Sequence, residues 1–281
     1  MSHFGIAGLQ LDLPSGNNLD AIAEEVVFTK RVYPWVKMIV LSELCAYGSS
    51  VANAEAVPGV ASKVFAKLAH ENDIYLIAGS IFEKDGDSIR NLTLVYGPDG
   101  REVARYAKMY PFEPYEQGVS PGQEFCVFDV PEVGRFGVSI CYDMWFPETT
   151  RTLAWMGAEV ILHPTMTGTM DRGAELAIAR SSAITNQVYF FDINGAGKLG
   201  NGQSIIVGPE GEVLHQASVG REIIPVEVDL ATLRRSRERG LMNLGQPLKS
   251  FRDHWRAFPP YQPGAKSETL EGLGPLKKPS E

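Results

Sequence analysis

Three apolar stretches of the sequence end in a residue whose side chain can take part in chemistry. Cys141 closes GVSIC, Glu43 follows MIVLS, and Lys108 follows REVARYA. Substrates of α/β proteins bind beyond the carboxyl ends of strands, so residues at strand ends are candidates for a site. A thiol has an ordinary pKa of about 8.5 and needs a base or a positive neighbour to be nucleophilic at neutral pH. Glu43 can supply the base and Lys108 the positive charge.

Each of these residues also has a structural explanation. Free cysteine is among the most buried residue types and mostly packs like a small apolar side chain. Glu43 could cap a loop or a helix, and Lys108 could be a solvated lysine on a hairpin. His163 also ends an apolar stretch, so a Cys141–His163 dyad is an alternative arrangement for a nucleophile and its base.

Composition excludes several classes of protein. The chain has 281 residues and a net charge of −8, which argues against nucleic acid or an anionic membrane as the main partner. Its cysteines, Cys45, Cys126 and Cys141, form no C-x-x-C pair, so we expect reduced thiols and no metal site. A redox sensor would need a second thiol near Cys141, for which Cys45 is a candidate. The N-terminal segment has no signal-peptide pattern, so a cytoplasmic location is expected.

The elements that must position these residues follow an α/β pattern. Apolar runs predicted as strands alternate with amphipathic segments predicted as helices, and Pro-Asp-Gly and Pro-Glu-Gly mark two hairpins. Because some strands are joined by hairpins and others by helices, we expect mixed sheets. Strands are predicted in 4–13, 36–44, 74–83, 90–108, 123–130, 134–141, 158–165, 188–195, 204–216 and 221–230. Helices are predicted in 17–35, 59–72, 147–157, 172–186 and 231–240.

The stretches around the three candidate residues resemble the nitrilase, or carbon–nitrogen hydrolase, superfamily. The matching stretches are VLSEL, RYAKMYPFEPYEQGVSPG and GVSICYDMWFPE, with further agreement in GAEVILHPT, NGQSIIVGPEGEVL and IPVEVDLATLRRSR. The resemblance implies a four-layer α-β-β-α sandwich with one hydrolase domain over residues 1–255. Residues 256–281 are expected to form an extended arm of that domain or an oligomer contact. Ser42 stands where the family often has proline, which leaves the Glu43 carboxylate untouched.

The resemblance also implies a Glu-Lys-Cys triad that needs no metal ion or organic cofactor. Glu43 would take the proton of the Cys141 thiol, which then attacks an amide-type carbonyl to form a thioester acyl-enzyme. The Lys108 ammonium and the backbone N–H of Tyr142 would stabilise the oxyanion.

The family places a second glutamate a few positions before a Pro-Gly pair. Glu116 fits that place, and it would orient Lys108 and the substrate or water. Glu113 lies close by, and the spacing alone leaves it as an alternative.

The residues after the nucleophile bear on the substrate. Nitrile-hydrolysing members usually read Cys-Trp-Glu, whereas this chain reads Cys-Tyr-Asp, as in the amidase and carbamoylase branches. Trp145 stands where omega-amidase-like members typically have an arginine, so an apolar surface replaces recognition of a substrate carboxylate. Tyr115 and Thr165 are further candidates for the wall of the substrate pocket.

The resemblance therefore implies an amidohydrolase that releases ammonia from a small linear amide or an N-carbamoyl amine. A nitrilase that converts a nitrile to an acid is one alternative, and a non-catalytic relative that acts as a binding protein is another. Family members usually form homodimers or larger homo-oligomers. We expect the helix in 147–157 and the C-terminal arm to lie at such an interface.

Overall fold

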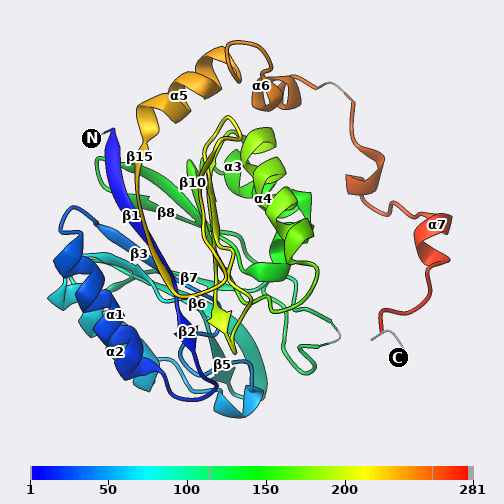
Figure 1. The fold of residues 1–281 in the computed structure, drawn as a ribbon. Helices are drawn as coiled ribbons and strands as arrows, with labels where there is room; N and C mark the ends of the chain where they lie inside the picture. Colours follow the sequence, from blue (N-terminus) through cyan, green and yellow to red (C-terminus); the bar gives the residue numbers. More distant parts are fainter. Residues whose placement is uncertain (1, 114, 255, 278–281) are drawn as a thin grey trace.

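Two large β-sheets form the centre of the computed structural model, which describes residues 2–113, 115–254 and 256–277 (Figure 1). The first sheet has the order β15 (Glu222–Asp229), β1 (His3–Gln10), β3 (Met38–Leu41), β4 (Tyr75–Ile77), β6 (Ser88–Tyr96) and β5 (Ile81–Asp85), with β7 (Glu102–Ala107) also paired to β6. The second sheet has the order β14 (Val213–Gln216), β13 (Ile205–Val207), β11 (Tyr189–Asn194), β10 (Val160–Thr165), β9 (Gly134–Val138) and β8 (Cys126–Val130). A short parallel pair joins β2 (Asp12–Leu13) to β12 (Ala196–Gly197).

Both sheets are mixed, as the sequence predicts. In the first, β1, β3 and β4 run parallel, while β15 and the β6 hairpins are antiparallel. In the second, β9, β10 and β11 run parallel, with antiparallel partners on both sides. The helices have the bounds α1 (Leu19–Val32), α2 (Val60–Glu71), α3 (Pro147–Trp155), α4 (Arg172–Asn186), α5 (Leu230–Arg239), α6 (Pro247–Arg252) and α7 (Glu268–Glu271).

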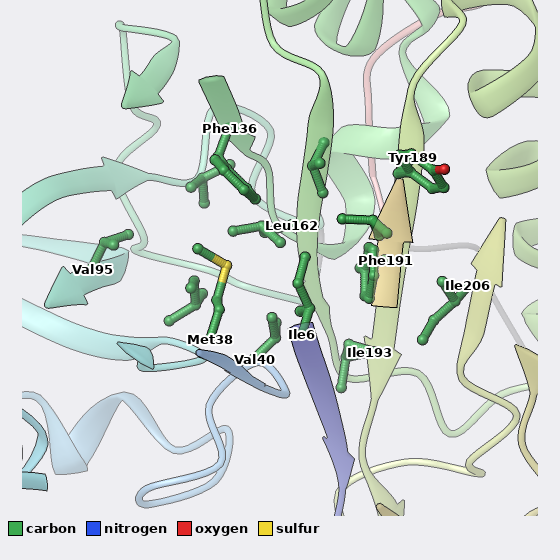
Figure 2. Close-up of a cluster of buried hydrophobic side chains, with 14 of the residues drawn as sticks. Ile6, Met38, Val40, Val95, Phe136, Leu162, Tyr189, Phe191, Ile193 and Ile206 are labelled. Atoms are coloured by element: carbon green, nitrogen blue, oxygen red, sulfur yellow. The ribbon is translucent and has the colours of Figure 1, made fainter. Parts of the chain in front are cut away.

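Alternate residues of the central strands point to opposite faces of the sheets. Ile6, Met38 and Val40 meet Leu162 and Phe191 in the core between the two sheets (Figure 2). The intervening residues of β1 and β3 pack against α1 and α2, in a cluster that includes Leu9, Ile39, Leu41, Ile22, Val26 and Phe65. Strands buried on both faces need almost continuous apolar sequence, which explains the apolar runs of β1 and β3.

The outer face of the second sheet is covered by α3 and α4. Their side chains form a separate buried cluster with that sheet, which includes Leu153, Ala154, Ala179, Ala183, Ile161 and Phe190. The order of layers is therefore α-β-β-α, and the fold class implied by the sequence is confirmed (Figure 1). In the described ranges, no helix combines the length and the apolar character needed to cross a bilayer.

The run 74–83, predicted as one strand, is divided into β4 and β5 by a break at residues 78–80, and both strands pair antiparallel with β6. The backbone of Gly79 has a φ of +62°, and a Cβ atom there would lie 2.0 Å from the carbonyl oxygen of Ser42. Only glycine fits such a close approach of two backbones. This break therefore packs directly against Ser42, the residue that precedes Glu43.

The C-terminal arm begins along the second sheet's helices and then leaves the body of the molecule (Figure 1). The ring of Phe251 in α6 lies 4.9 Å from the guanidinium of Arg151 in α3, and the hydroxyl of Tyr261 donates a hydrogen bond to Glu148 at 2.6 Å. The segment around α7 is exposed. Residues 278–281 of the predicted arm lie outside the described residues.

Phe191 offers a test of the packing between the sheets. It is fully buried between them, so Phe191→Ala removes a ring and leaves a cavity. We expect this change to lower the free energy of unfolding by about 3–5 kcal/mol. Val219→Ala, at a side chain that is 62% exposed, should change it by less than about 0.5 kcal/mol. Urea unfolding of both variants measures the difference, and equal losses would contradict this core.

Candidate active site

The candidate residues from both sheets meet at the carboxyl ends of the strands that precede them. Glu43 follows β3, Lys108 follows β7, and Cys141 follows β9. The backbone N–H of Glu43 donates to the carbonyl oxygen of Thr165 at the end of β10, at 3.2 Å, and so links the two sheets at this point. All three side chains line one cavity of about 620 Å³, together with Glu116.

Cys141 lies on a tight turn that presents its thiol to the cavity. Its φ of +46° is left-handed, a conformation that costs a non-glycine residue of order 1 kcal/mol and needs support from its surroundings. Asp143 supplies that support: its Oδ2 accepts hydrogen bonds from the backbone N–H of Ile140 at 2.8 Å and from the hydroxyl of Tyr106 at 2.7 Å. Its Oδ1 accepts a hydrogen bond from the backbone N–H of Tyr110 at 2.9 Å.

The Lys108 ammonium is held between two carboxylates. Its Nζ lies 2.9 Å from Glu43 Oε1 and 2.7 Å from Glu116 Oε2, and its side chain is only 2% exposed. Asn91 Nδ2 donates to both carboxylates, at 2.8 Å to Glu43 and 3.0 Å to Glu116. The backbone N–H of Phe112 adds a third donor to Glu116, at 2.6 Å. The three charged side chains therefore form one hydrogen-bonded unit.

Burial and charge act differently on the pKa values of this unit. Burial alone would lower the pKa of Lys108, but Glu43, Cys141 and Glu116 outweigh it, and the net shift is upward. Burial raises the pKa of Glu43 more than Lys108 lowers it. For Glu116 burial is outweighed by Lys108 and by the surrounding donors, so its pKa is lowered. Lys108 and Glu116 thus form a fixed ion pair, whereas Glu43 is the carboxylate that can exchange a proton.

The thiol of Cys141 is protonated at neutral pH in this environment. Burial raises its pKa well above the ordinary value, the negative charge of Glu43 raises it further, and Lys108 opposes both. A nucleophilic thiol here needs a base that takes its proton during attack. A buried carboxylate with a raised pKa suits that task, because the best general base has a pKa near the working pH.

A second polar network lies behind the nucleophile. Thr167 Oγ1 is 3.9 Å from Cys141 Sγ and donates to Glu175 Oε1 at 3.0 Å. Arg172 Nη1 lies 3.0 Å from Glu175 and 2.8 Å from Asp192, and all three side chains are buried. Burial, followed by the charge of Asp192, raises the pKa of Glu175 to about 6.

Aromatic side chains form part of the cavity wall. The rings of Phe112 and Tyr115 stack with centroids 4.8 Å apart, and both residues line the cavity. Tyr142, next to the nucleophile, also lies 4.8 Å from the ring of Phe112. Tyr115 lines the cavity and is 56% exposed.

Two predicted pocket residues lie elsewhere among the described residues. Trp145 is at the far end of the 3₁₀ turn Cys141–Trp145 and packs near Tyr142, outside the lining of the cavity. The hydroxyl of Thr165 donates to Asp192 at 2.8 Å, so it forms a hydrogen bond between two strands of the second sheet. The next residue along the chain, Met166, lines the cavity instead. Trp145 and Thr165, which the sequence predicts for the pocket wall, are therefore not among the described residues that line this cavity.

Glu113 and His163, the alternatives to Glu116 and Glu43, are not among the described residues that line the cavity. His163 is fully buried, with Nδ1 2.7 Å from Ser139 Oγ, and burial lowers its pKa to about 4. The geometry favours Glu43 over His163 as the partner of the thiol.

The two remaining cysteines are buried and separate from the site. Burial raises the pKa of Cys45 to about 12 and that of Cys126 to about 11. Neither lines the cavity, and in the described part of the chain no disulfide is formed. Among the same residues, no cluster of His, Cys, Asp and Glu side chains could hold a metal ion.

Several residues of the site were missed from the sequence. Asn91 is a polar residue inside β6, at the start of the apolar run NLTLV, and a polar side chain next to such a run was the signal that could have found it. Arg172 and Glu175 have the i, i+3 spacing of a pair at the start of α4, which more often indicates a surface ion pair. Nothing in the spacing of Thr167 indicates contact with a thiol.

Comparison with known proteins identifies the family of the chain. Residues 18–238 match the profile of the carbon-nitrogen hydrolase family. The omega-amidase NIT2 of Homo sapiens is 31% identical over 259 residues, covering 85% of this chain and 93% of that protein. The crystal structure of Saccharomyces cerevisiae Nit3, a member of the nitrilase superfamily, has a TM-score of 0.78 and 29% identity, covering 84% of this chain and 94% of that one.

A carbon-nitrogen hydrolase from Helicobacter pylori has a TM-score of 0.77 and 26% identity, and covers 90% of this chain and 96% of its own. This chain is therefore similar to these proteins both in sequence and in fold. The chain belongs to the carbon–nitrogen hydrolase family, within the nitrilase superfamily.

Proposed function

We propose that this protein is a cysteine-dependent amidohydrolase that releases ammonia from a linear amide or an N-carbamoyl amine. The observation that carries the proposal is the buried Lys108, held by Glu43 and Glu116 in the same cavity as Cys141. The relatives named omega-amidases, such as the human protein at 31% identity, support the same class of reaction.

The first half of the proposed reaction makes the acyl-enzyme. Glu43 takes the thiol proton as Cys141 Sγ bonds to the carbonyl carbon, and the carbonyl oxygen becomes an oxyanion. Lys108 and the backbone N–H of Tyr142 stabilise this charge, and removal of such a donor typically costs a few kcal/mol of barrier. Glu43 then gives its proton to the leaving nitrogen, the C–N bond breaks, and ammonia departs from a thioester.

The second half hydrolyses the thioester. Glu43 takes a proton from water as the water oxygen bonds to the acyl carbon. The C–S bond then breaks, and Glu43 returns the proton to the sulfur, which releases the acid and restores the thiol. Glu116 remains ionised throughout, because its pKa is lowered by Lys108 and its donors. Its role in this proposal is to hold Lys108 and to orient the substrate or water.

The two alternatives make different demands on the site. A nitrilase attacks a carbon–nitrogen triple bond, and the residues after Cys141 do not match the Cys-Trp-Glu of such enzymes. A non-catalytic relative has no physical need for a buried lysine beside a thiol, since an ion pair at full burial often stabilises less than apolar packing does.

Association into a homodimer or larger oligomer stays part of the proposal.

The first prediction concerns the nucleophile and the substrate class together. We expect ammonia release from at least one class in a panel of aliphatic amides, aromatic amides, N-carbamoyl amines and nitriles. Cys141→Ala should reduce that release by about 10⁴-fold or more, because the covalent step is lost. Cys126→Ala is the matched control and should retain activity, since Cys126 lies outside the cavity.

Activity that survives Cys141→Ala would contradict the proposed nucleophile. Turnover of nitriles to acids with no hydrolysis of amides would favour a nitrilase. A folded protein with no turnover in any class would favour the non-catalytic relative.

The second prediction separates Glu116 from Glu113. The charge of Glu116 raises the pKa of Glu43, so Glu116→Gln should lower that pKa. Glu43 must be ionised to act as a base, so the acid limb of kcat/KM should move to lower pH. We also expect kcat/KM to fall by about 10- to 1000-fold, because Lys108 loses a partner.

Glu113→Gln is the matched control, and it should leave both the rate and the acid limb unchanged. A pH profile of kcat/KM for the two variants measures both effects. If Glu113→Gln moves the acid limb and Glu116→Gln does not, the assignment of the second glutamate is reversed.

A further inference from the structure

Negative charge predominates on the wall of the cavity. Glu43, Glu116 and Asp171 line it, and Lys108 is the only basic residue among the described residues of the lining. Lys108 is already bound to Glu43 and Glu116 at 2.9 and 2.7 Å. No cationic side chain of this wall is therefore left to pair with a carboxylate on a substrate.

This excess does not depend on the proton of Glu43. With Glu43 ionised, three carboxylates face one ammonium. With Glu43 protonated, Lys108 and Glu116 balance each other, and Asp171 leaves the wall negative. Asp171 precedes α4 and accepts a hydrogen bond from the hydroxyl of Thr169, and no ion pair joins it to a basic side chain in the described ranges.

Charges behind the wall have the same sign. Arg172 is shared by Glu175 and Asp192, so this buried group carries two carboxylates for one guanidinium. Asp143, under the turn of Cys141, is hydrogen-bonded to neutral donors, and burial raises its pKa to about 6. At neutral pH it is mostly ionised. Of these groups, Glu175 acts directly on the nucleophile, because its negative charge raises the pKa of the Cys141 thiol.

The rest of the cavity wall is largely apolar, with Leu44, Val51, Phe82, Phe112, Met166 and Met170. Apolar walls lower the local dielectric constant, so charges on the wall act more strongly on a bound molecule than they would in water. An anionic group on the substrate would lose its hydration and meet like charges. An uncharged or cationic group would not.

We propose that the site selects amides by charge: it accepts uncharged and cationic acyl groups and excludes anionic ones, with Asp171 as the residue that sets the preference for a cation. The inference rests on the proposed amidohydrolase function, of which it names the substrate class. It predicts that this chain differs from any relative that uses an arginine to bind a substrate carboxylate.

The charge at Cys141 can be measured without turnover. Two methanethiosulfonates of similar size, one with a trimethylammonium group and one with a sulfonate group, each form a mixed disulfide with the thiol and release methanesulfinate. Their rates at Cys141 are measured by peptide mass mapping, and each is divided by its rate with free cysteine. We expect the cationic reagent to be favoured by about tenfold or more.

Substitutions test whether Asp171 causes the preference for the cationic reagent. Asp171→Asn should reduce the preference for the cationic reagent by about two- to fivefold, and Asp171→Lys should reduce it further. Asp20→Asn is the matched control, because Asp20 is exposed on α1, on the outer face of the other sheet, and it should leave the preference unchanged. Added salt should weaken the preference in the wild type.

Turnover provides the second readout. Butanamide, 4-aminobutanamide and succinamate have similar length and carry no charge, a positive charge and a negative charge at the far end. We expect kcat/KM for succinamate to be at least about tenfold below that for butanamide, and Asp171→Asn to lower the ratio for 4-aminobutanamide over butanamide.

The two readouts separate the possible failures. A reagent preference for the sulfonate, or faster turnover of succinamate than of butanamide, would overturn the charge selection and leave the amidohydrolase in place. A cationic preference without turnover of any amide or N-carbamoyl amine would support the negative charge of the cavity and overturn the proposed function. An Asp171→Asn variant that leaves the reagent preference unchanged would refute the role of Asp171.

Discussion

The burial of one ammonium group determines the arrangement of the site. Lys108 is 2% exposed, and a cation removed from water needs charged partners and hydrogen bonds within a few ångströms. Glu43 and Glu116 provide them, and Asn91 holds both carboxylates in place. Burial, together with the charge of Glu116, keeps the pKa of Glu43 raised despite Lys108, so Glu43 remains available for proton transfer. The charges of Lys108, Glu43 and Glu116 thus depend on one another.

The two sheets surround the group of Lys108, Glu43 and Glu116 and hold it in a rigid frame. The first sheet supplies Glu43 and Lys108, and the second supplies Cys141. A backbone hydrogen bond from Glu43 to Thr165 joins the sheets at the site, and the apolar core between them fixes their separation (Figure 2). The close passage of Gly79 under Ser42 and the left-handed turn of Cys141 are local conformations that such a frame can impose.

Much of this could be predicted from the sequence, because strand ends and apolar runs are local signals. The layers, the mixed sheets and the convergence of Glu43, Lys108, Cys141 and Glu116 follow from them and from the family resemblance. The contacts that join distant segments could not be predicted. Thr167 donates a hydrogen bond to Glu175, and Arg172 pairs with Asp192. Both contacts depend on how α4 packs against β11. The same applies to Thr165, which does not line the cavity although its neighbour Met166 does, and to Trp145, which packs near Tyr142.

The central claim is that Cys141 forms the covalent bond to the substrate. An activated ester, 4-nitrophenyl butanoate, carries the acyl group of butanamide and acylates a thiol faster than water removes the product. The protein is mixed with this ester, quenched in acid within the first turnovers, digested, and mapped by mass. Our account predicts a butanoyl group in place of the thiol hydrogen of Cys141. A butanoyl group on Cys45, Cys126 or another nucleophile, with Cys141 unmodified, would contradict it.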